Sequence, residues 1–146
     1  MADVSFSTVL SRLEARVETV TGFKRSLRPL DPAMDPNSIG DKRYAIDLRT
    51  SNARIFRDKA GQTARVEHET HVRFLRRLPP KDQNTRLGDS MDDELDIIQA
   101  LSAQTGSWQQ DLSIIWAGSI REVLDPGEWL LTTITFSVSH DISLTV

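Results

Sequence analysis

Cysteine is absent from the chain, and so is any long run of apolar residues. Without cysteine the protein has no disulfide framework, no thiolate nucleophile and no cysteine-based metal site, which fits assembly in a reducing compartment. No apolar run approaches the ~18 residues that a membrane helix needs, and no basic-then-apolar leader opens the sequence. We therefore expect neither a membrane partner nor a secretory signal.

The motifs that commonly mark catalytic sites are also missing. The sequence contains no HExxH, GxSxG, Walker or GxGxxG pattern. Of the histidines, His68 and His71 have opposite parity on one expected strand, so their rings cannot hold a metal ion together. His140 falls on the apolar parity of the last strand, which is typical of a core or interface histidine. We expect a protein that is not an enzyme and has no cofactor or resident metal.

One carboxylate cluster keeps an enzymatic alternative open. The cluster consists of Asp89, Asp92, Asp93, Glu94 and Asp96. Its four aspartates are spaced at three and four residues, so part of the cluster shares a helical face and could bind a divalent cation through oxygens. Acids in the first turn of a helix equally well complement the positive end of its dipole. The alternative is a small metal-dependent enzyme that uses the Asp89–Asp96 cluster.

Aromatic residues are scarce at 6% of the chain, and the basic residues are interleaved with acids. No stacking platform for nucleic-acid bases is therefore expected. An electropositive lumen past which DNA travels needs charge and no base readout. The expected contact with nucleic acid is limited to non-specific passage of DNA.

Basic residues nearly disappear from the last part of the sequence. Residues 1–86 hold 17 Lys and Arg against 11 Asp and Glu, a balance of +6, whereas residues 87–146 hold Arg121 alone against ten acids, a balance of −9. If the two parts form different surfaces, copies of the chain can associate front to back in a heterologous contact, which closes into a ring when the rotation allows. The charges intermix instead if both parts share one surface.

The stretch from Trp129 to Val146 shows the clearest secondary-structure pattern. Alternate positions are apolar and hydroxyl-bearing, as in a half-buried strand, and no Gly or Pro interrupts them. A strand of this length exceeds the common range, so it either bends within the domain or is completed from outside the chain. Its face of Thr133, Thr135, Ser137 and Ser139 is a surface that another subunit could cover.

The remaining elements follow in order along one domain, residues 1–146. An amphipathic helix is expected over Ser5–Val20. A second helix is expected to begin at Asp89 or Ser90 and to run to about Ala103. Its buried stripe is expected to consist of Met91, Leu95, Ile98 and Leu101, widened by Ile97. Strands are expected over residues 43–50, 64–78 and 112–124, with an irregularity in the last at Ala117-Gly118. Extended loops are expected over 23–41 and 51–63. The fold class is α+β, with a largely antiparallel or mixed four-stranded sheet, two main helices packed on one face, and long loops.

Several local patterns resemble the tail terminator proteins of long-tailed, siphophage-type phages and the related tail-completion proteins of the neck. They are FSTVLSRLEARVETV with the Pro-rich loop after it, RYAIDLRTS, DSMDDELDIIQAL and GEWLLTTITFSVSHDISL. The resemblance spans most of the chain, in pattern more than in identities. It implies a structural virion subunit, assembled in the host cytoplasm, that forms a homohexameric ring on the tail tube and stops its growth. It also implies contacts with the major tail tube protein and with the head-side connector or stopper protein.

Three other functions remain open beside the tail terminator. They are a head–tail stopper or adaptor of the neck, the metal-dependent enzyme, and a binding module whose loops hold a peptide. For the ring or tube contacts we expect basic residues in the second loop and at a strand end to meet acidic residues at the start of the second helix. These are Arg54, Arg57, Lys59, Arg76 and Arg77 on the basic side and Asp92, Asp93 and Glu94 on the acidic side.

Overall fold

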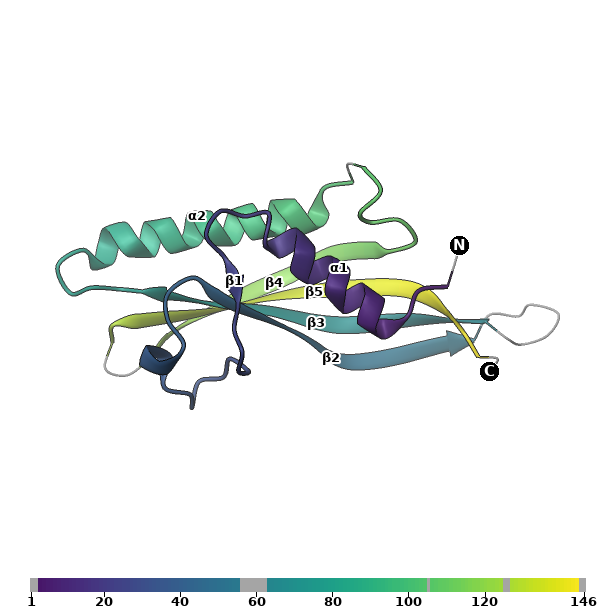
Figure 1. Cartoon of the computed structure of the whole chain (residues 1–146), viewed down its shortest axis with the longest axis horizontal. Coiled ribbons are helices and arrows are strands. Elements are labelled where there is room, and N and C mark those ends of the chain that lie inside the picture. Colours follow the sequence, from purple (N-terminus) through teal and green to yellow (C-terminus); the bar gives the residue numbers. More distant parts are fainter. Residues whose placement is uncertain (1–2, 56–62, 105, 125–126, 145–146) are drawn as a thin grey trace.

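A computed structural model of the chain describes residues 3–55, 63–104, 106–124 and 127–144 (Figure 1). Two helices and five strands make up its regular structure, so the expected α+β class is confirmed. The elements are α1 Phe6–Val17, β1 Lys24–Arg25, the short 3₁₀ helix η1 Pro36–Ser38, β2 Arg43–Ile55, β3 Thr63–Arg77, α2 Gln83–Ser102, β4 Ser113–Leu124 and β5 Trp129–Ser143.

The strands form one mixed sheet in the order β1-β2-β3-β5-β4. The β1–β2 pair is parallel and the other three pairs are antiparallel. Five strands replace the four that we expected, because β1 lies inside the stretch 23–41 that the sequence predicted as loop. A strand of two residues carries no period, and only its pairing with Arg43 and Tyr44 of β2 makes it a strand.

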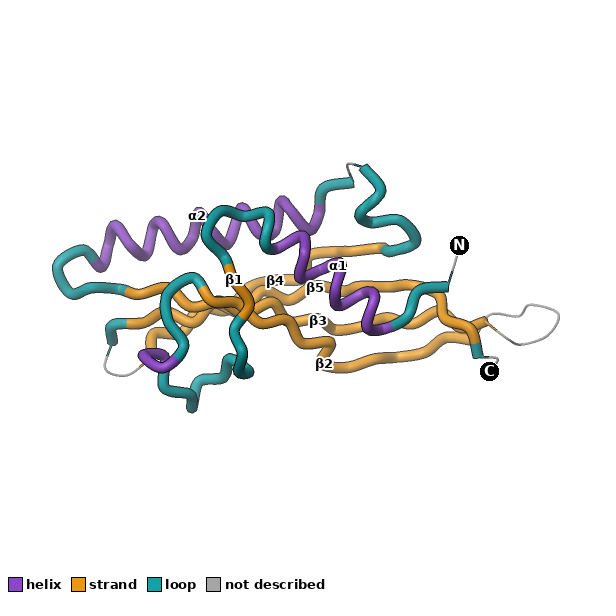
Figure 2. Tube along the Cα trace, viewed as in Figure 1, coloured by secondary structure: helices purple, strands orange, loops and turns teal. Residues whose placement is uncertain are grey.

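Both helices lie on the same face of the sheet, as expected (Figures 1 and 2). Ser5 caps the start of α1, and its side chain accepts a hydrogen bond from the backbone N–H of Thr8. Val9, Leu13 and Val17 recur at helical spacing and are buried. They pack with the apolar side chains of α2 and of the central strands in the main core, which includes Val4, Phe23, Tyr44, Val72, Phe74, Ile97, Leu101, Ile134, Phe136 and Val138.

The opposite face is covered at one end by the Pro-rich segment 26–41. Leu30 is buried there with Leu75, Leu124, Trp129 and Leu131 in a second apolar cluster. The indole N–H of Trp129 donates a hydrogen bond of 3.1 Å to Asn37 Oδ1, which ties the segment to β5. Most of this loop is therefore part of the folded body rather than a free arm.

The central strand β5 is completed within the chain. It pairs with β3 along one side from Trp129 to Ser143 and with β4 along the other. With 15 residues β3 is as long as β5, and β4 has 12 residues. The length of β5 therefore does not require a partner outside the chain, and the open edges of the sheet lie at β2 and β4 instead.

Two boundaries differ from expectation in ways that bear on function. β2 continues to Ile55, so residues 51–55 are strand rather than loop, and residues 56–62 lie outside the described part. α2 begins at Gln83 rather than at Asp89 or Ser90, because a helix tolerates Gly88 and no proline interrupts residues 83–102. Asp92, Asp93 and Glu94 consequently lie in the middle of α2, and their expected role at the first turn is wrong.

Two smaller expectations can be compared directly. The irregularity expected at Ala117-Gly118 is a register shift between Trp116 and Gly118 in the pairing of β4 with β5. Among the described helices, none combines the length and the apolar composition that crossing a membrane would require.

Candidate functional site

The buried stripe of α2 agrees with the predicted one only in part, since Ile97 and Leu101 are buried as expected but Met91 and Leu95 are not. Its buried residues are Ser90, Glu94, Ile97 and Leu101. Met91 and Leu95, which were expected inside, are 45% and 50% exposed, and Leu87 one turn earlier is also exposed. The helix is thus turned so that an acidic residue faces the sheet and a row of large apolar side chains faces outward.

Two ion pairs explain this orientation of α2. Glu94 is 4% exposed, and both of its carboxylate oxygens accept hydrogen bonds of 2.7 Å from the guanidinium of Arg121 on β4. Asp93, one position along, pairs with the buried Arg76 of β3. A bidentate arginine contact compensates the desolvation of a buried carboxylate, so these pairs hold α2 over β3 and β4.

The exposed apolar row lies on the flank of α2 that faces away from α1. The opposite flank faces α1 and carries Ala100 and Asp93. The carbonyl of Ala100 accepts a hydrogen bond of 2.9 Å from Arg16 of α1, and Asp93 pairs with Arg76. Leu87, Met91 and Leu95 follow at intervals of four residues on the other side of the buried stripe. This places the row along the β4 side of the molecule.

β4 itself is an edge strand with exposed apolar residues on both faces. Ile115 and Ile120 are 63% and 64% exposed, and Trp116 and Val123 are also exposed. A long, uncovered, apolar edge offers unpaired backbone groups to another strand, and natural proteins usually blunt such an edge with charges, proline or short length. We call β4 together with the row on α2 the β4 surface, which comprises Leu87, Met91, Leu95, Ile115, Trp116, Ile120 and Val123.

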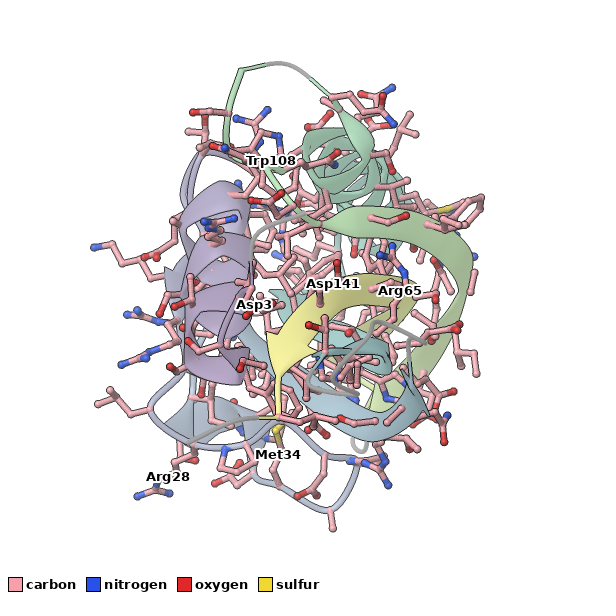
Figure 3. All side chains as sticks on the ribbon, turned by 90° about the vertical axis from the view of Figure 1, so that its right-hand side faces the viewer. Asp3, Arg28, Met34, Arg65, Trp108 and Asp141 are labelled. Carbon is pink, nitrogen blue, oxygen red and sulfur yellow. The ribbon has the colours of Figure 1, made fainter. Side chains whose placement is uncertain are left out.

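The other edge of the sheet has a different character. β1 pairs only with Arg43 and Tyr44, so the outer side of β2 is unpaired in the described chain from Ala45 onward. A groove of about 490 Å³ opens where β1 leaves β2. We call it the β2 groove; its lining includes Arg25, Leu27, Arg28, Ala45, Asp47 and Arg73. Arg28 extends away from the body of the molecule at this edge (Figure 3).

The sheet order separates the two charge classes of the sequence. The strands β1, β2 and β3 come from the part with a balance of +6, whereas α2 beyond Arg86, β4 and β5 come from the part with a balance of −9. The β2 edge and the β4 edge therefore belong to oppositely charged halves of the molecule. Ion pairs such as Arg76–Asp93 and Arg65–Asp141 (3.3 Å; Figure 3) join the halves inside one chain.

A chain of hydrogen bonds between three side chains crosses the sheet beneath α1. Ser51 Oγ lies 2.7 Å from His68 Nδ1, and His68 Nε2 lies 2.7 Å from His140 Nε2. Both imidazoles are fully buried, and the ring of Phe6 packs edge-on against each of them. The pairing confirms the core role expected for His140 and adds His68, whose even position in β3 puts it on the same face.

This Ser–His–His arrangement resembles a nucleophile and its base in geometry, but its chemistry is structural. Burial, followed by the charge of His140, lowers the pKa of His68 to about 4, so its ring is a weak proton acceptor at neutral pH. Burial also lowers the pKa of His140. The β2 groove is not lined by Ser51. The histidine pair therefore stabilises the packing of α1 on β3 and β5.

Some of the residues expected at the interface are buried within the chain, some are exposed, and some lie outside the described part. The structure brings Arg76 and Asp93 together, but within one chain rather than between two. Glu94 is buried against Arg121 and does not reach the surface. Arg77 and Asp92 are exposed. The remaining three were Arg54, whose side chain lies outside the described part, and Arg57 and Lys59, which lie wholly outside it.

The carboxylate cluster of α2 does not assemble into a metal site in the described chain. No group of three or more His, Asp or Glu side chains among the described residues could hold a metal ion. Two members of the cluster, Asp93 and Glu94, are engaged by arginines instead. Arg76 was expected to meet this acidic group across an interface rather than within the chain, and Arg121 on β4 could not be identified as the partner of Glu94 from local spacing.

Comparison with known proteins finds no protein-family model that matches this chain and no similar protein among curated ones.

Proposed function

We propose that the chain is a structural virion protein, a tail terminator that forms a ring on the tail tube of a long-tailed phage. In this role it stops growth of the tube and provides the surface for head–tail joining. Its partners are other copies of itself in a ring, expected to be a hexamer, the major tail tube protein and the head-side connector or stopper. DNA passes through the lumen without base-specific contacts.

The observation that carries the proposal is the β4 surface. Seven large apolar side chains are exposed on one strand and the helix beside it, although the same chain buries a substantial core elsewhere. These side chains flank one uncovered sheet edge on both of its faces, and an apolar edge of this kind is typical of an interaction site. A subunit that completes its surface only in an assembly accounts for this feature, and an enzyme acting as a monomer does not.

Two further features support the same proposal. The order of elements agrees with the patterns on which the resemblance to tail terminators rests, a helix and Pro-rich loop followed by two strands, a helix and a final hairpin. The separation of charge between the two edges of the sheet favours head-to-tail contacts between copies, which close into rings.

A stopper or adaptor of the neck is the nearest alternative, since it shares the ring architecture and differs in position. Gene order separates the two, because a terminator gene is expected beside the gene of the major tail protein. The metal-dependent enzyme is less favoured, since Asp93 and Glu94 are held by Arg76 and Arg121.

The proposal is tested with the purified chain and tail tubes assembled from the major tail protein encoded beside it. Size-exclusion chromatography with light scattering measures the oligomer, and negative-stain images show where it binds. We expect rings, either free or at one end of each tube, and tubes that stop elongating when the chain is added. A chain that stays monomeric at high concentration and leaves tube growth unchanged overturns the proposal.

A further inference from the structure

We infer that the β4 edge of one copy pairs antiparallel with the free part of β2 in the next copy, so that the sheet continues across the interface. The partner is a second copy of this chain, and the contact is heterologous. The inference deepens the proposed function and rests on it for the biological setting, although the contact can be tested without a tail tube.

Both edges have the groups that such a pairing needs. Each edge strand offers backbone N–H and C=O groups, over 12 residues in β4 and from Ala45 onward in β2. The row is interrupted by a register shift between Trp116 and Gly118 in β4 and by another between Leu48 and Thr50 in β2. β4 contains no proline, and its charged residues are the adjacent pair Arg121 and Glu122. Arg121 is held by Glu94 of the same chain. β4 also has no lysine and no proline, the residues that commonly protect a sheet edge from pairing.

The direction of the pairing follows from the sheet order. From β2 through β3 and β5 to β4 every neighbouring pair is antiparallel. A second copy placed in the same orientation therefore sets its β2 antiparallel to β4 and continues the alternation. The helices of both copies then lie on the same face of the joined sheet, and the row Leu87, Met91 and Leu95 faces the incoming copy.

Charge decides between this contact and a symmetric one. A β4–β4 contact across a twofold axis would bring together two copies of α2. In each copy Asp93 and Glu94 are paired with Arg76 and Arg121, and Asp89, Asp92 and Asp96 outnumber the single basic residue of the helix, Arg86. The heterologous contact instead brings the acidic half of one copy to an edge that carries Lys24 and Arg28, together with Arg25, which pairs with Glu14 of its own chain. Like charges at an interface oppose association, and opposite charges both attract and orient the partners.

The β2 groove lies where the incoming strand would run. β1 follows the outer side of β2 as far as Arg25, and Ser26 makes one more backbone hydrogen bond to Tyr44 before the chain turns away. Leu27, at the rim of the groove, is 94% exposed. An arriving β4 would run along the outer side of β2 beyond the end of β1. Glu122 of β4 would then be available to Arg28, since Arg25 already pairs with Glu14 at 3.4 Å.

Two variants, each affecting one edge, test the contact. Ile115→Lys/Ile120→Lys puts charges on β4, and Leu27→Glu/Arg28→Glu reverses the sign at the β2 groove. Leu144→Lys is the matched control, since Leu144 is an exposed apolar residue outside both edges. Circular dichroism and thermal melting first establish that each variant folds. Sedimentation at several concentrations then measures self-association.

Each edge variant alone is expected to raise the dissociation constant of self-association by about tenfold or more, while Leu144→Lys changes it little. A mixture of the two edge variants is expected to form a one-to-one dimer that grows no further, because one intact β4 edge meets one intact β2 edge. Equal weakening by Leu144→Lys, or unaltered assembly of either folded edge variant, overturns the inference. A mixture that remains monomeric also overturns it.

The outcome also separates the contact from the proposed function. If wild-type chain caps tail tubes while both edge variants assemble normally, the contact is wrong and the function stands. If assembly depends on both edges as described but tubes are neither bound nor capped, the contact stands and the function fails.

Discussion

The Nε2 atoms of His68 and His140 lie 2.7 Å apart in the core, so one imidazole donates a proton to this hydrogen bond and the other accepts it. If a second proton bound to the accepting ring, both Nε2 atoms would carry a hydrogen, and the two N–H groups would repel each other. The rings are fully buried between β3, β5 and Phe6 of α1. Ser51 contacts the other ring nitrogen of His68, and the Arg65–Asp141 ion pair lies at the nearby end of the sheet. A neutral histidine pair is thus built into the contact between helix and sheet.

The histidine pair predicts that the protein loses stability in mild acid. Because the pKa of His68 is about 4 in the folded chain and 6.5 when exposed, the unfolded chain binds more protons between these values. The stability is complete above about pH 6.5 and falls as the pH drops toward 4, by an amount on the order of 3 kcal/mol. Urea denaturation at pH 7, 6 and 5 measures this slope.

Substitution separates this effect from general acid denaturation. His68→Gln/His140→Gln retains amide groups that can pair and removes the titration, so its stability is expected to vary less between pH 5 and 7. His71→Gln, on the opposite face of β3, is the control and retains most of the slope. An equally steep slope in the double variant would contradict the role of the pair.

Removing Arg121 is expected to destabilise the fold by about 2–3 kcal/mol, because Glu94 would remain buried without its partner. The partial exposure of Arg121 keeps the figure below that of a fully buried pair. Glu122→Ala, at the exposed neighbouring position, is expected to change stability by less than about 0.5 kcal/mol. Urea denaturation of Arg121→Ala and Glu122→Ala compares them, and equal effects would refute the argument.

Arg76 and Arg77 are expected to respond differently to substitution although they are adjacent. Arg76 is buried with Asp93 and close to Asp41, so Arg76→Ala should cost about 3 kcal/mol or more of folding stability. Arg77 is exposed, and Arg77→Ala should stay within about 0.5 kcal/mol of wild type. Thermal melting of both variants measures the difference; matching melting temperatures would show that the ion pair contributes nothing.

Charge reversal at Arg77 is expected to weaken self-association more at low salt than at high salt. Its exposed guanidinium acts through solvent, where ions screen it over a Debye length of about 10 Å at 0.1 M. Arg77→Glu, compared with wild type by light scattering at two salt concentrations, tests this. A loss of association that does not change with salt would count against an electrostatic contribution.

The cap of α1 supplies a test that does not involve the interface. Ser5→Ala removes the acceptor for the N–H of Thr8 and is expected to cost about 1 kcal/mol, whereas Ser5→Asp retains an acceptor and should preserve most of the stability. Urea denaturation of both variants measures this. Equal losses would show that the side-chain oxygen does not stabilise the helix start.

Patterns with a clear period could be predicted from the sequence alone. The alternation in β3 and β5 identifies both strands and their inner faces, including the opposite parity of His68 and His71. The spacing of Val9, Leu13 and Val17 identifies α1 and its buried side. These predictions succeed because burial of one face is a local consequence of helix or strand geometry.

The start of α2 and its buried side could not be predicted in the same way. Residues 83–88 are mostly polar and include a glycine, which is typical of a loop, yet the helix begins at Gln83. The stripe of Met91 and Leu95 is the more apolar one, but Glu94 turns inward because Arg121 receives it from a strand 27 residues later. Two-residue β1 likewise exists only through its pairing with β2.

The sequence by itself determined the α+β class, the central strand β5 and the unequal distribution of charge along the chain, because composition and periodicity are local properties. Only the tertiary structure decided that β5 is paired on both sides while β4 and most of β2 form the open edges. Strand order depends on contacts between distant segments, which no local pattern encodes. The same order carries the basic and acidic halves of the chain to opposite edges of one sheet.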